Sequence, residues 1–327
     1  MEATQTIESI LAYCAKEGLD IDASTLAPLD SAGFMSRVLT ARSDKGEVVI
    51  TIVAQPVPEQ LYQGGGEKIL KVGRLLAGVP QIPHIYLTGP LPNKGYFIVQ
   101  ERKPGTPLGR RVYSGGTFVD EFLVEDPQRL VEELEEVILQ IHEHRFTSFG
   151  YIDLQASAIQ GSHASWPEFL LDNFKRNISM LEAAEASHGV SYFSAVSADE
   201  FRRKIEDLLS LNRECFEIES ASLIHGDVLN YSNVLVEDGK VTGVVDLEWA
   251  LLGHPAWEFV FRKQPPIGRY VPLAKQKGLI PPDIDFKRSV ALHNIFWCAW
   301  GASVHATNPE FGSALFKSFI TSLQSEV

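Results

Sequence analysis

The sequence has few cysteines and no long apolar run. Its three cysteines, Cys14, Cys215 and Cys298, lie far apart, which excludes a disulfide framework or a zinc site built on paired cysteines. We therefore expect a reducing compartment. No apolar stretch approaches the length needed to cross a membrane, and residues 1–16 lack the basic head of a signal peptide. These absences predict a cytoplasmic protein with no membrane contact.

Basic residues are also scarce. The chain carries 29 Lys and Arg against 42 Asp and Glu, a formal net charge of -13, and it has no basic stripe that could neutralise nucleic acid phosphates. Nucleic acid is therefore not an expected partner, whereas a cationic small molecule is compatible with this charge. At 327 residues, of which 45% are hydrophobic, the chain is long enough to fill the cores of two domains.

The most informative stretch spans residues 223–260. Its pattern predicts a strand, a polar loop and a β-hairpin, because Asp238 and Gly239 stand between two runs rich in β-branched residues. Even pairing across this turn puts Asn233 opposite Val244, two residues before Asp246. The polar ends of both hairpin strands are therefore expected to meet at one edge.

Two carboxylates and an amide converge at that edge, because the loop carrying Asp227 leads directly into the first hairpin strand. Converging carboxylates repel each other unless a cation neutralises them. Oxygen ligands from Asn233 and Asp246 suit magnesium, which binds one or two protein side chains together with substrate phosphates. Asp227 is then free to accept a proton from a hydroxyl group, which is the division of roles in phosphoryl transfer.

This ordered set resembles the signature motifs of the aminoglycoside phosphotransferase and choline kinase family, small-molecule relatives of the protein kinases. The resemblance implies that Asp227 is the catalytic base, that Asn233 and Asp246 hold magnesium, and that His225 braces the loop. It also implies ATP or GTP as the phosphoryl donor and a hydroxylated small molecule as the acceptor. A thinner likeness over residues 146–166 points to the hygromycin B phosphotransferase branch.

The match contains two departures. Asn233 follows Asp227 by six residues where the family has five, so one residue has to bulge out, and Asn230 stays open as an alternative ligand. His254 stands between a glycine and a proline where the family carries an aspartate. Whatever that carboxylate braces must therefore be held in another way.

The resemblance implies an α+β, two-lobed, protein-kinase-like fold with a small antiparallel-sheet N-lobe and a larger, mainly helical C-lobe. We expect the N-terminal nucleotide-binding lobe at residues 1–102 and the catalytic and substrate-binding lobe at residues 103–327, joined through a Pro-Gly linker. After an opening helix, apolar spacing predicts strands at 34–41, 48–53, 85–87 and 96–100, and helices at 67–77, 127–142, 167–185, 199–211 and 288–306.

The small lobe is expected to bind the nucleotide. By resemblance, the turn with Ser31, Gly33 and Ser36 covers the phosphates, and the backbone of Gln100, Glu101 and Arg102 forms the hinge that binds adenine.

Thr51 stands where the family carries the lysine that contacts the phosphates, and Thr cannot supply that charge. Lys68 or Lys71 on the next helix could reach in instead. Alternatively, the site binds nucleotide weakly or prefers a different one. Glu67 occupies the place of the family's helix glutamate, which pairs with the lysine that is missing here. Alternatively, Glu67 is an ordinary solvated residue, and the sequence favours neither interpretation.

The acceptor is expected to contact the C-terminal lobe. Trp297 and Trp300 lie on a predicted helix and could stack on a sugar or a cation, although a plain core helix is the simpler interpretation. Glu248 and Glu258 could each face the acceptor or have a structural role, and the sequence does not favour either alternative. By resemblance to the family, His142 at the end of its helix is expected to be a buried packing residue.

The sequence thus predicts a small-molecule kinase that phosphorylates a hydroxyl of an aminoglycoside-type antibiotic, an activity that would confer antibiotic resistance. Two alternatives stay open. One is a kinase for a metabolite such as choline, homoserine or a sugar amine, and the other is a catalytically silent binding protein. The absence of a lysine at Thr51 favours the silent protein, whereas the presence of Asp227, Asn233 and Asp246 together argues against it.

Overall fold

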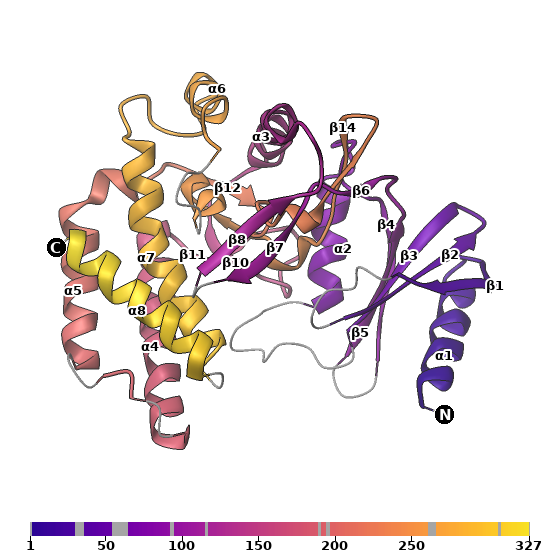
Figure 1. Cartoon of the computed structure of the whole chain (residues 1–327), viewed down its shortest axis with the longest axis horizontal. Coiled ribbons are helices and arrows are strands. Elements are labelled where there is room, and N and C mark those ends of the chain that lie inside the picture. The colour runs from indigo at the N-terminus through magenta and orange to yellow at the C-terminus, as the bar shows by residue number, and fades with distance from the viewer. Residues whose placement is uncertain are drawn as a thin grey trace.

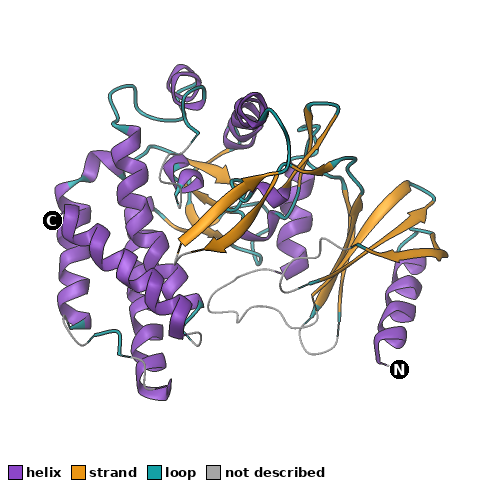
Figure 2. Cartoon of the chain, in the orientation of Figure 1, coloured by secondary structure: helices purple, strands orange, loops and turns teal. Residues whose placement is uncertain are grey.

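A computed structural model describes residues 2–29, 36–53, 65–91, 95–114, 117–188, 191–193, 197–260, 266–306 and 309–326. It confirms the predicted α+β class, with an antiparallel-sheet lobe at the N-terminus and a mainly helical lobe at the C-terminus. The sheet lobe lies at one end of the molecule, and most helices of the C-terminal lobe gather at the other end (Figures 1 and 2).

The N-terminal lobe is built on one antiparallel sheet. Its strands have the spatial order β1-β2-β3-β5-β4 and are β1 Ile21–Pro28, β2 Arg37–Ser43, β3 Gly46–Val53, β4 Ile85–Pro90 and β5 Tyr96–Glu101. The predicted strands are confirmed; the one predicted at 34–41 is β2, and residues 34 and 35 lie outside the described residues. Helix α1, Glu2–Lys16, packs Ile10 and Cys14 on one face of the sheet, because its apolar residues recur at helical spacing.

Helix α2, Gly65–Leu75, lies on the other face of the sheet, within the large core that also includes residues of the C-terminal lobe. Gly66 and Gly73 are two helical turns apart and share one face. A Cβ atom at these positions would lie 1.8 Å from Thr88 Oγ1 and 2.3 Å from Ile85 Cγ1, so the glycines let α2 approach β4 closely. Lys68, two residues after Gly66, is therefore turned away from β4.

The C-terminal lobe contains most of the helices. They are α3 Pro127–His142, α4 Trp166–His188, α5 Ala198–Leu211, α6 Tyr270–Gln276, α7 Phe286–Val304 and α8 Pro309–Glu326. The four helices predicted here are confirmed as α3, α4, α5 and α7. Figure 1 shows α4, α5, α7 and α8 gathered at the end of the molecule away from the small lobe. Within the described ranges, no helix is both long and apolar enough to span a membrane.

Short strands connect these helices and carry the loops of the site. They are β6 Thr106–Pro107, β9 Arg145–Phe146, β10 Phe149–Ile152, β11 Gly161–His163, β12 Ala221–Ile224 and β15 Leu251–Gly253. A separate hairpin of β7 Gly109–Ser114 and β8 Thr117–Phe122 was not predicted. The small-lobe sheet ends at Glu101, and the next strand, β6, pairs with a strand of the C-terminal lobe. The predicted lobe boundary between residues 102 and 103 stays a prediction.

The predicted hairpin is present as β13 Val234–Glu237 and β14 Lys240–Val244. Asp238 and Gly239 have φ angles of 49° and 69°, as the tight two-residue turn requires. Glu237 pairs with Lys240 and Val236 with Val241, but the register then shifts.

That shift makes the predicted pairing of Asn233 with Val244 wrong. Leu235 pairs with Gly243, so Thr242 forms a bulge, and its Oγ1 donates to Pro104 O at 2.6 Å. Asn233 therefore lies opposite Val245, whose N–H donates to Asn233 O at 2.9 Å. The bulge brings Asn233 one residue closer to Asp246 than even pairing would.

The close approach of α2 and β4 predicts the effect of one methyl group. We expect Gly66→Ala to lower the free energy of unfolding by roughly 1–3 kcal/mol, because the β-branched Thr88 cannot move aside easily. This loss is expected despite the better helix propensity of alanine. Gly78→Ala, where the new Cβ meets nothing within 4 Å, is the control in urea unfolding. Equal stability of the two variants would show that α2 does not pack this closely.

Candidate active site

The loop that carries Asp227 is held from below by Glu258. The two carboxylate oxygens of Glu258 accept the backbone N–H groups of His225 at 2.7 Å and of Gly226 at 3.0 Å, and His142 Nε2 lies 3.3 Å away. Burial alone would raise the pKa of Glu258, but its interactions with His142 and His225 together outweigh burial and lower the pKa. The structure therefore favours the structural alternative for Glu258 over contact with the acceptor.

His225 ties the same loop to the end of the hairpin. Its Nε2 donates to Val245 O at 3.0 Å, and its Nδ1 accepts the N–H of Asp227 at 3.3 Å. Burial lowers the pKa of His225, which favours the neutral ring that this pattern needs. Gly226 has a φ of 86°, and a Cβ there would lie 2.5 Å from Trp249 O. Only glycine therefore fits at position 226.

The extra residue between Asp227 and Asn233 is absorbed by two successive tight turns. Asn230 N donates to Asp227 O at 3.1 Å and Asn233 N to Asn230 O at 2.8 Å, the second turn being the 3₁₀ helix η3, Tyr231–Asn233. Residues three apart in such a helix share one face. The Nδ2 groups of both asparagines accordingly donate to Asp227 Oδ2, at 3.0 Å and 2.9 Å. No residue has to bulge out of the loop.

The two asparagines differ in what their oxygens do. Asn230 Oδ1 accepts the hydroxyl of Ser232 at 2.8 Å. Asn233 directs its Nδ2 at Asp227, to the backbone oxygen as well as the carboxylate, which turns its Oδ1 away from that residue. The bonding therefore favours Asn233 over Asn230 as a metal ligand, and the ligand assignment itself stays a prediction.

Asp246 follows the hairpin in a conformation that few aspartates adopt. Its φ of 70° and ψ of 64° are left-handed, a strained choice that is typical of functional positions. Nearby protein atoms raise the pKa of Asp246, and the negative charges of Glu248 and Asp227 raise it further, although the residue is exposed to solvent. A carboxylate in this setting is ready to be neutralised by a cation.

The oxygen donors fit magnesium better than a softer metal. The described residues include no group of three or more His, Cys, Asp and Glu arranged to hold a metal ion. Magnesium needs no such group, because it takes one or two protein oxygens and completes its coordination with water and phosphate. Asn233 and Asp246 could supply those two oxygens.

Residues of both lobes meet beside Asp246. Glu248, in the 3₁₀ helix η4 Leu247–Trp249, accepts the hydroxyl of Tyr96 on β5 at 2.8 Å. Lys68 of α2 is 2% exposed, donates to Ala250 O at 3.3 Å and interacts with the charges of Glu248 and Asp246. Burial lowers the pKa of Lys68 to about 7.

Thr51 lies on the sheet face that looks toward this junction, because its cross-strand partner Ile98 belongs to the core shared with the C-terminal lobe. Lys71 points elsewhere and donates to Leu154 O and Ala156 O at 3.0 Å and 3.2 Å. Glu67 is exposed and pairs with Lys71, so the solvated alternative holds for this residue. Of the two lysines considered, Lys68 reaches the site.

The predicted nucleotide contacts of the small lobe are only partly described. Ser31 and Gly33 lie outside the described residues, and Ser36 directly precedes β2. The backbone N–H groups of Glu101 and Arg102 donate to His84 O at 2.8 Å and Glu47 O at 3.0 Å.

Gln100 is paired within the sheet with residues of β3 and β4. The three hinge residues are thus tied into the small lobe. Adenine binding at the hinge stays a prediction, and the N–H groups of Glu101 and Arg102 are not available for it because they already donate within the small lobe. Thr51 has no charge to offer the phosphates.

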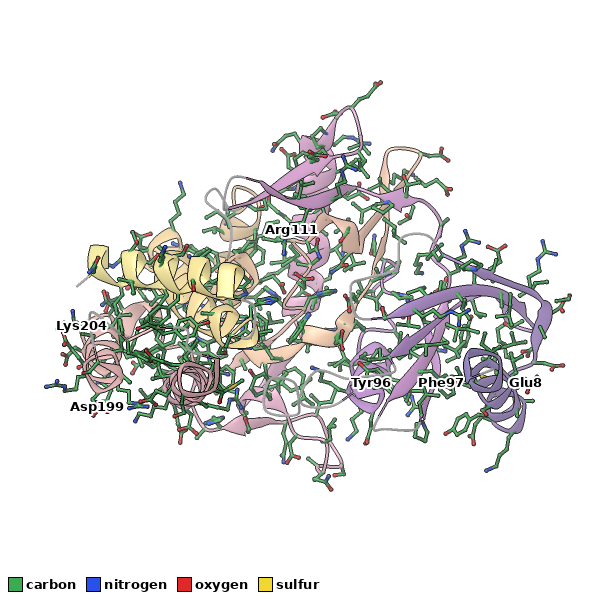
Figure 3. All side chains as sticks on the ribbon, turned by 60° about the horizontal axis from the view of Figure 1, so that its bottom comes forward. Glu8, Tyr96, Phe97, Arg111, Asp199 and Lys204 are labelled. Carbon is green, nitrogen blue, oxygen red and sulfur yellow. The ribbon has the colours of Figure 1, made fainter. Side chains whose placement is uncertain are left out.

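On the other side of Asp227 stands an arginine that sequence reasoning missed. Arg111 of β7 places Nη1 3.8 Å from Asp227 Oδ1. Burial raises the pKa of Asp227, and the positive charge of Arg111 opposes that rise. Figure 3 labels Arg111 and Tyr96, which come from different elements around the site. Gly115 and Gly116 separate two runs of β-branched and aromatic residues, a hairpin signal that could have located the strand of Arg111. The position of that hairpin beside Asp227 depends on tertiary packing.

Three partly exposed tryptophans lie beside the loop. Trp249 meets Trp300 edge to face with ring centroids 5.1 Å apart, and Trp297 lies 6.1 Å from Trp300. The carbonyl of Trp249 touches Gly226, which connects this aromatic group to the catalytic loop. Trp297 and Trp300 are therefore near the site, and their contact with an acceptor stays a prediction.

His254 replaces the expected aspartate as a helix cap. Its Nδ1 accepts the N–H of Ala256 at 3.0 Å at the start of the 3₁₀ helix η5, Pro255–Phe259, and an aspartate cap works by the same kind of bond. The helix carries Glu258, so the cap helps to place that carboxylate. His254 stacks near His293, with ring centroids 4.8 Å apart, and His293 Nε2 accepts the indole N–H of Trp166 at 2.8 Å.

The fold and this loop geometry define a kinase-like phosphotransferase. Residues 30–261 match the model of the phosphotransferase enzyme family, and because this is more than half of the 327 residues, the chain belongs to that family. A search of curated proteins found no significant match.

Solved structures with the same fold include three kinds of phosphotransferase. Aminoglycoside phosphotransferase APH(4)-Ia is 16% identical with a TM-score of 0.62, covering 98% of this chain and 99% of that one. Macrolide 2'-phosphotransferase MphH from Brachybacterium faecium is 20% identical with a TM-score of 0.58, covering 98% of each. A fructosamine kinase-like protein from Haemophilus somnus is 14% identical with a TM-score of 0.62, covering 99% and 97%. At these identities the likeness shows the kinase-like fold.

The buried histidines predict how stability depends on pH. Burial lowers the pKa of His293 to about 4 and that of His254 well below its ordinary value. Below about pH 6.5 the unfolded chain binds protons that the folded chain does not. We therefore expect the free energy of unfolding to fall between pH 6.5 and pH 5, by about 1.4 kcal/mol per pH unit for each such histidine.

His293→Gln tests this expectation in urea unfolding at several pH values. In the variant, the free energy of unfolding should depend less steeply on pH, by the equivalent of about one proton. A slope unchanged by His293→Gln would mean that His293 takes up its proton in the folded state.

Proposed function

We propose that the protein transfers the γ-phosphoryl group of ATP or GTP to a hydroxyl group of an aminoglycoside-type acceptor. The observation that carries the proposal is the loop in which Asn230 and Asn233 both donate to one oxygen of Asp227, with Asp246 at the end of the adjoining hairpin. Family membership supports phosphoryl transfer. A structural neighbour bound to ADP and hygromycin B supports a nucleotide donor and an aminoglycoside acceptor.

In this proposal Asp227 is the catalytic base. Its Oδ2 is held by the two asparagines, so Oδ1, the oxygen beside Arg111, takes the proton of the acceptor hydroxyl. The hydroxyl oxygen forms a bond to the γ-phosphorus as the bond from that phosphorus to the bridging oxygen of the nucleoside diphosphate breaks. His225 and Glu258 contribute by keeping the loop in place, because the hydroxyl must stand within hydrogen-bond reach of the base.

Asn233 and Asp246 are the residues that would hold magnesium. When bound, the ion neutralises charge on the phosphates as the bond breaks. Asp246 must be ionised to serve as a ligand, and its crowding by Glu248 and Asp227 explains why a cation is needed there. Asn233 adds a neutral oxygen without adding to that repulsion.

A second acceptor class is favoured by Arg111. A guanidinium 3.8 Å from the catalytic carboxylate suits an acceptor with a carboxylate or phosphate near its hydroxyl, since arginine binds such groups with paired hydrogen bonds. An aminoglycoside, which is cationic, would be repelled by the same group. The second candidate is therefore a metabolite kinase, and the fructosamine kinase-like neighbour has this fold.

The acceptor class is tested by the release of nucleoside diphosphate with magnesium and ATP or GTP. The panel should contain aminoglycosides, macrolides, and sugar amines with and without a carboxylate, with Asp227→Ala as the blank. Turnover that depends on an aminoglycoside supports the leading proposal, and preference for the carboxylate-bearing sugar amine supports the second. Nucleotide binding without turnover on any acceptor would favour a catalytically silent protein.

Substitution of the two aspartates separates their roles. We expect Asp227→Ala to lower kcat by about a hundredfold or more, the usual contribution of a general base, with nucleotide affinity nearly unchanged. Asp246→Ala should weaken binding of magnesium and nucleotide together, as measured by calorimetry. Equal loss of turnover and of nucleotide affinity in both variants would contradict the roles assigned.

A further inference from the structure

The site contains more negative charge than magnesium alone offsets. The negative charges of Asp227 and Glu248 both act on Asp246, and a bound nucleoside triphosphate would add its own charge. On strand β3, Thr51 faces the junction of the lobes and supplies no cation. A positive side chain from another element is therefore needed close to the phosphates.

Lys68 is the lysine that the fold directs to this place. Helix α2 packs its glycine face on β4, which leaves Lys68 on the opposite side, where Nζ donates to Ala250 O at 3.3 Å. The charges that act on it are those of Glu248 and Asp246. Arg111, which is partly buried, lies instead at Asp227, on the acceptor side of the site.

Burying a lysine is costly for the fold. Removing an ammonium group from water costs roughly several kcal/mol even when carboxylates lie nearby. An apolar side chain of similar length would fill the same space at a lower free-energy cost. Besides its hydrogen bond to Ala250 O, Lys68 experiences the negative charges of both Glu248 and the metal-side carboxylate Asp246. The arrangement suits a charge that is used when a ligand binds.

We propose that Lys68, on helix α2, supplies the positive charge for the nucleotide phosphates that strand β3 lacks at Thr51, with Glu248 as its resident carboxylate partner. The inference rests on the proposed function, because it assumes a nucleotide beside Asp246. In this proposal, the lysine–glutamate charge pair joins α2 to η4. In the family pattern, the pair would join β3 to α2. Tyr96, which donates to Glu248, keeps that carboxylate in position.

Direct binding of ATP, with and without magnesium, tests the proposal by calorimetry. We expect Lys68→Met to weaken binding of ATP in both conditions by about tenfold to a hundredfold, the range for one charged hydrogen bond. Lys71→Met, the same change one turn along the helix, should leave the affinity unchanged. Thr51→Lys introduced into Lys68→Met should recover most of the loss, because the charge then comes from β3.

Several outcomes would overturn the proposal. They are wild-type affinity in Lys68→Met, an equal loss in Lys71→Met, or no recovery with Thr51→Lys. If Lys68→Met does not fold, Lys68→Met with Glu248→Gln removes both charges and carries the test, and wild-type affinity in that variant would also overturn it.

The result also separates this proposal from the proposed function. A parent protein that binds ATP but phosphorylates no acceptor contradicts the function alone, and the comparison of variants still decides the role of Lys68. A parent protein that binds no nucleotide contradicts both. Urea unfolding of each variant shows whether a loss of affinity follows from a loss of fold.

Discussion

The structure depends on the electrostatic repulsion among Asp227, Asp246 and Glu248, which meet where the two lobes come together. Carboxylates gathered among protein atoms raise one another's pKa and destabilise the fold unless positive charge offsets them. Two positive side chains offset this repulsion. Arg111 lies 3.8 Å from Asp227, and Lys68, which donates to Ala250 O, interacts with the charges of Glu248 and Asp246. What is left uncompensated at Asp246 is the part that a bound cation would neutralise.

The surrounding fold keeps these groups apart by fixing short backbone segments. Glu258 holds the loop of Asp227 through two N–H groups, and His225 ties that loop to Val245. A bulge at Thr242 sets the end of the hairpin. Each contact is local, and together they place a proton acceptor and a metal-binding edge side by side. Phosphoryl transfer depends mainly on such positioning and on charge stabilisation, so a small set of well-held residues is sufficient.

Much of this arrangement could be predicted from the sequence because it depends on local patterns. The Asp-Gly turn, the apolar spacing of α3 and the order of Asp227, Asn233 and Asp246 gave the hairpin, the helix and the family. The bulge at Thr242 could not be predicted, since it depends on a contact with the distant Pro104. The sequence does carry a hairpin signal after Arg111, since Gly115 and Gly116 separate two runs of β-branched and aromatic residues, but no local pattern places that hairpin beside Asp227. The choice of Lys68 over Lys71 required the packing of glycines on β4.

The most direct test of this account is the affinity of the parent protein for ATP as the magnesium concentration is raised, measured by calorimetry at constant ionic strength. The account predicts that affinity rises with magnesium and that calcium or sodium at equal ionic strength substitutes poorly, because Asn233 and Asp246 offer a small oxygen site that the phosphates complete. Affinity that does not depend on magnesium would contradict the assignment of Asp246 and, with it, the proposed mechanism.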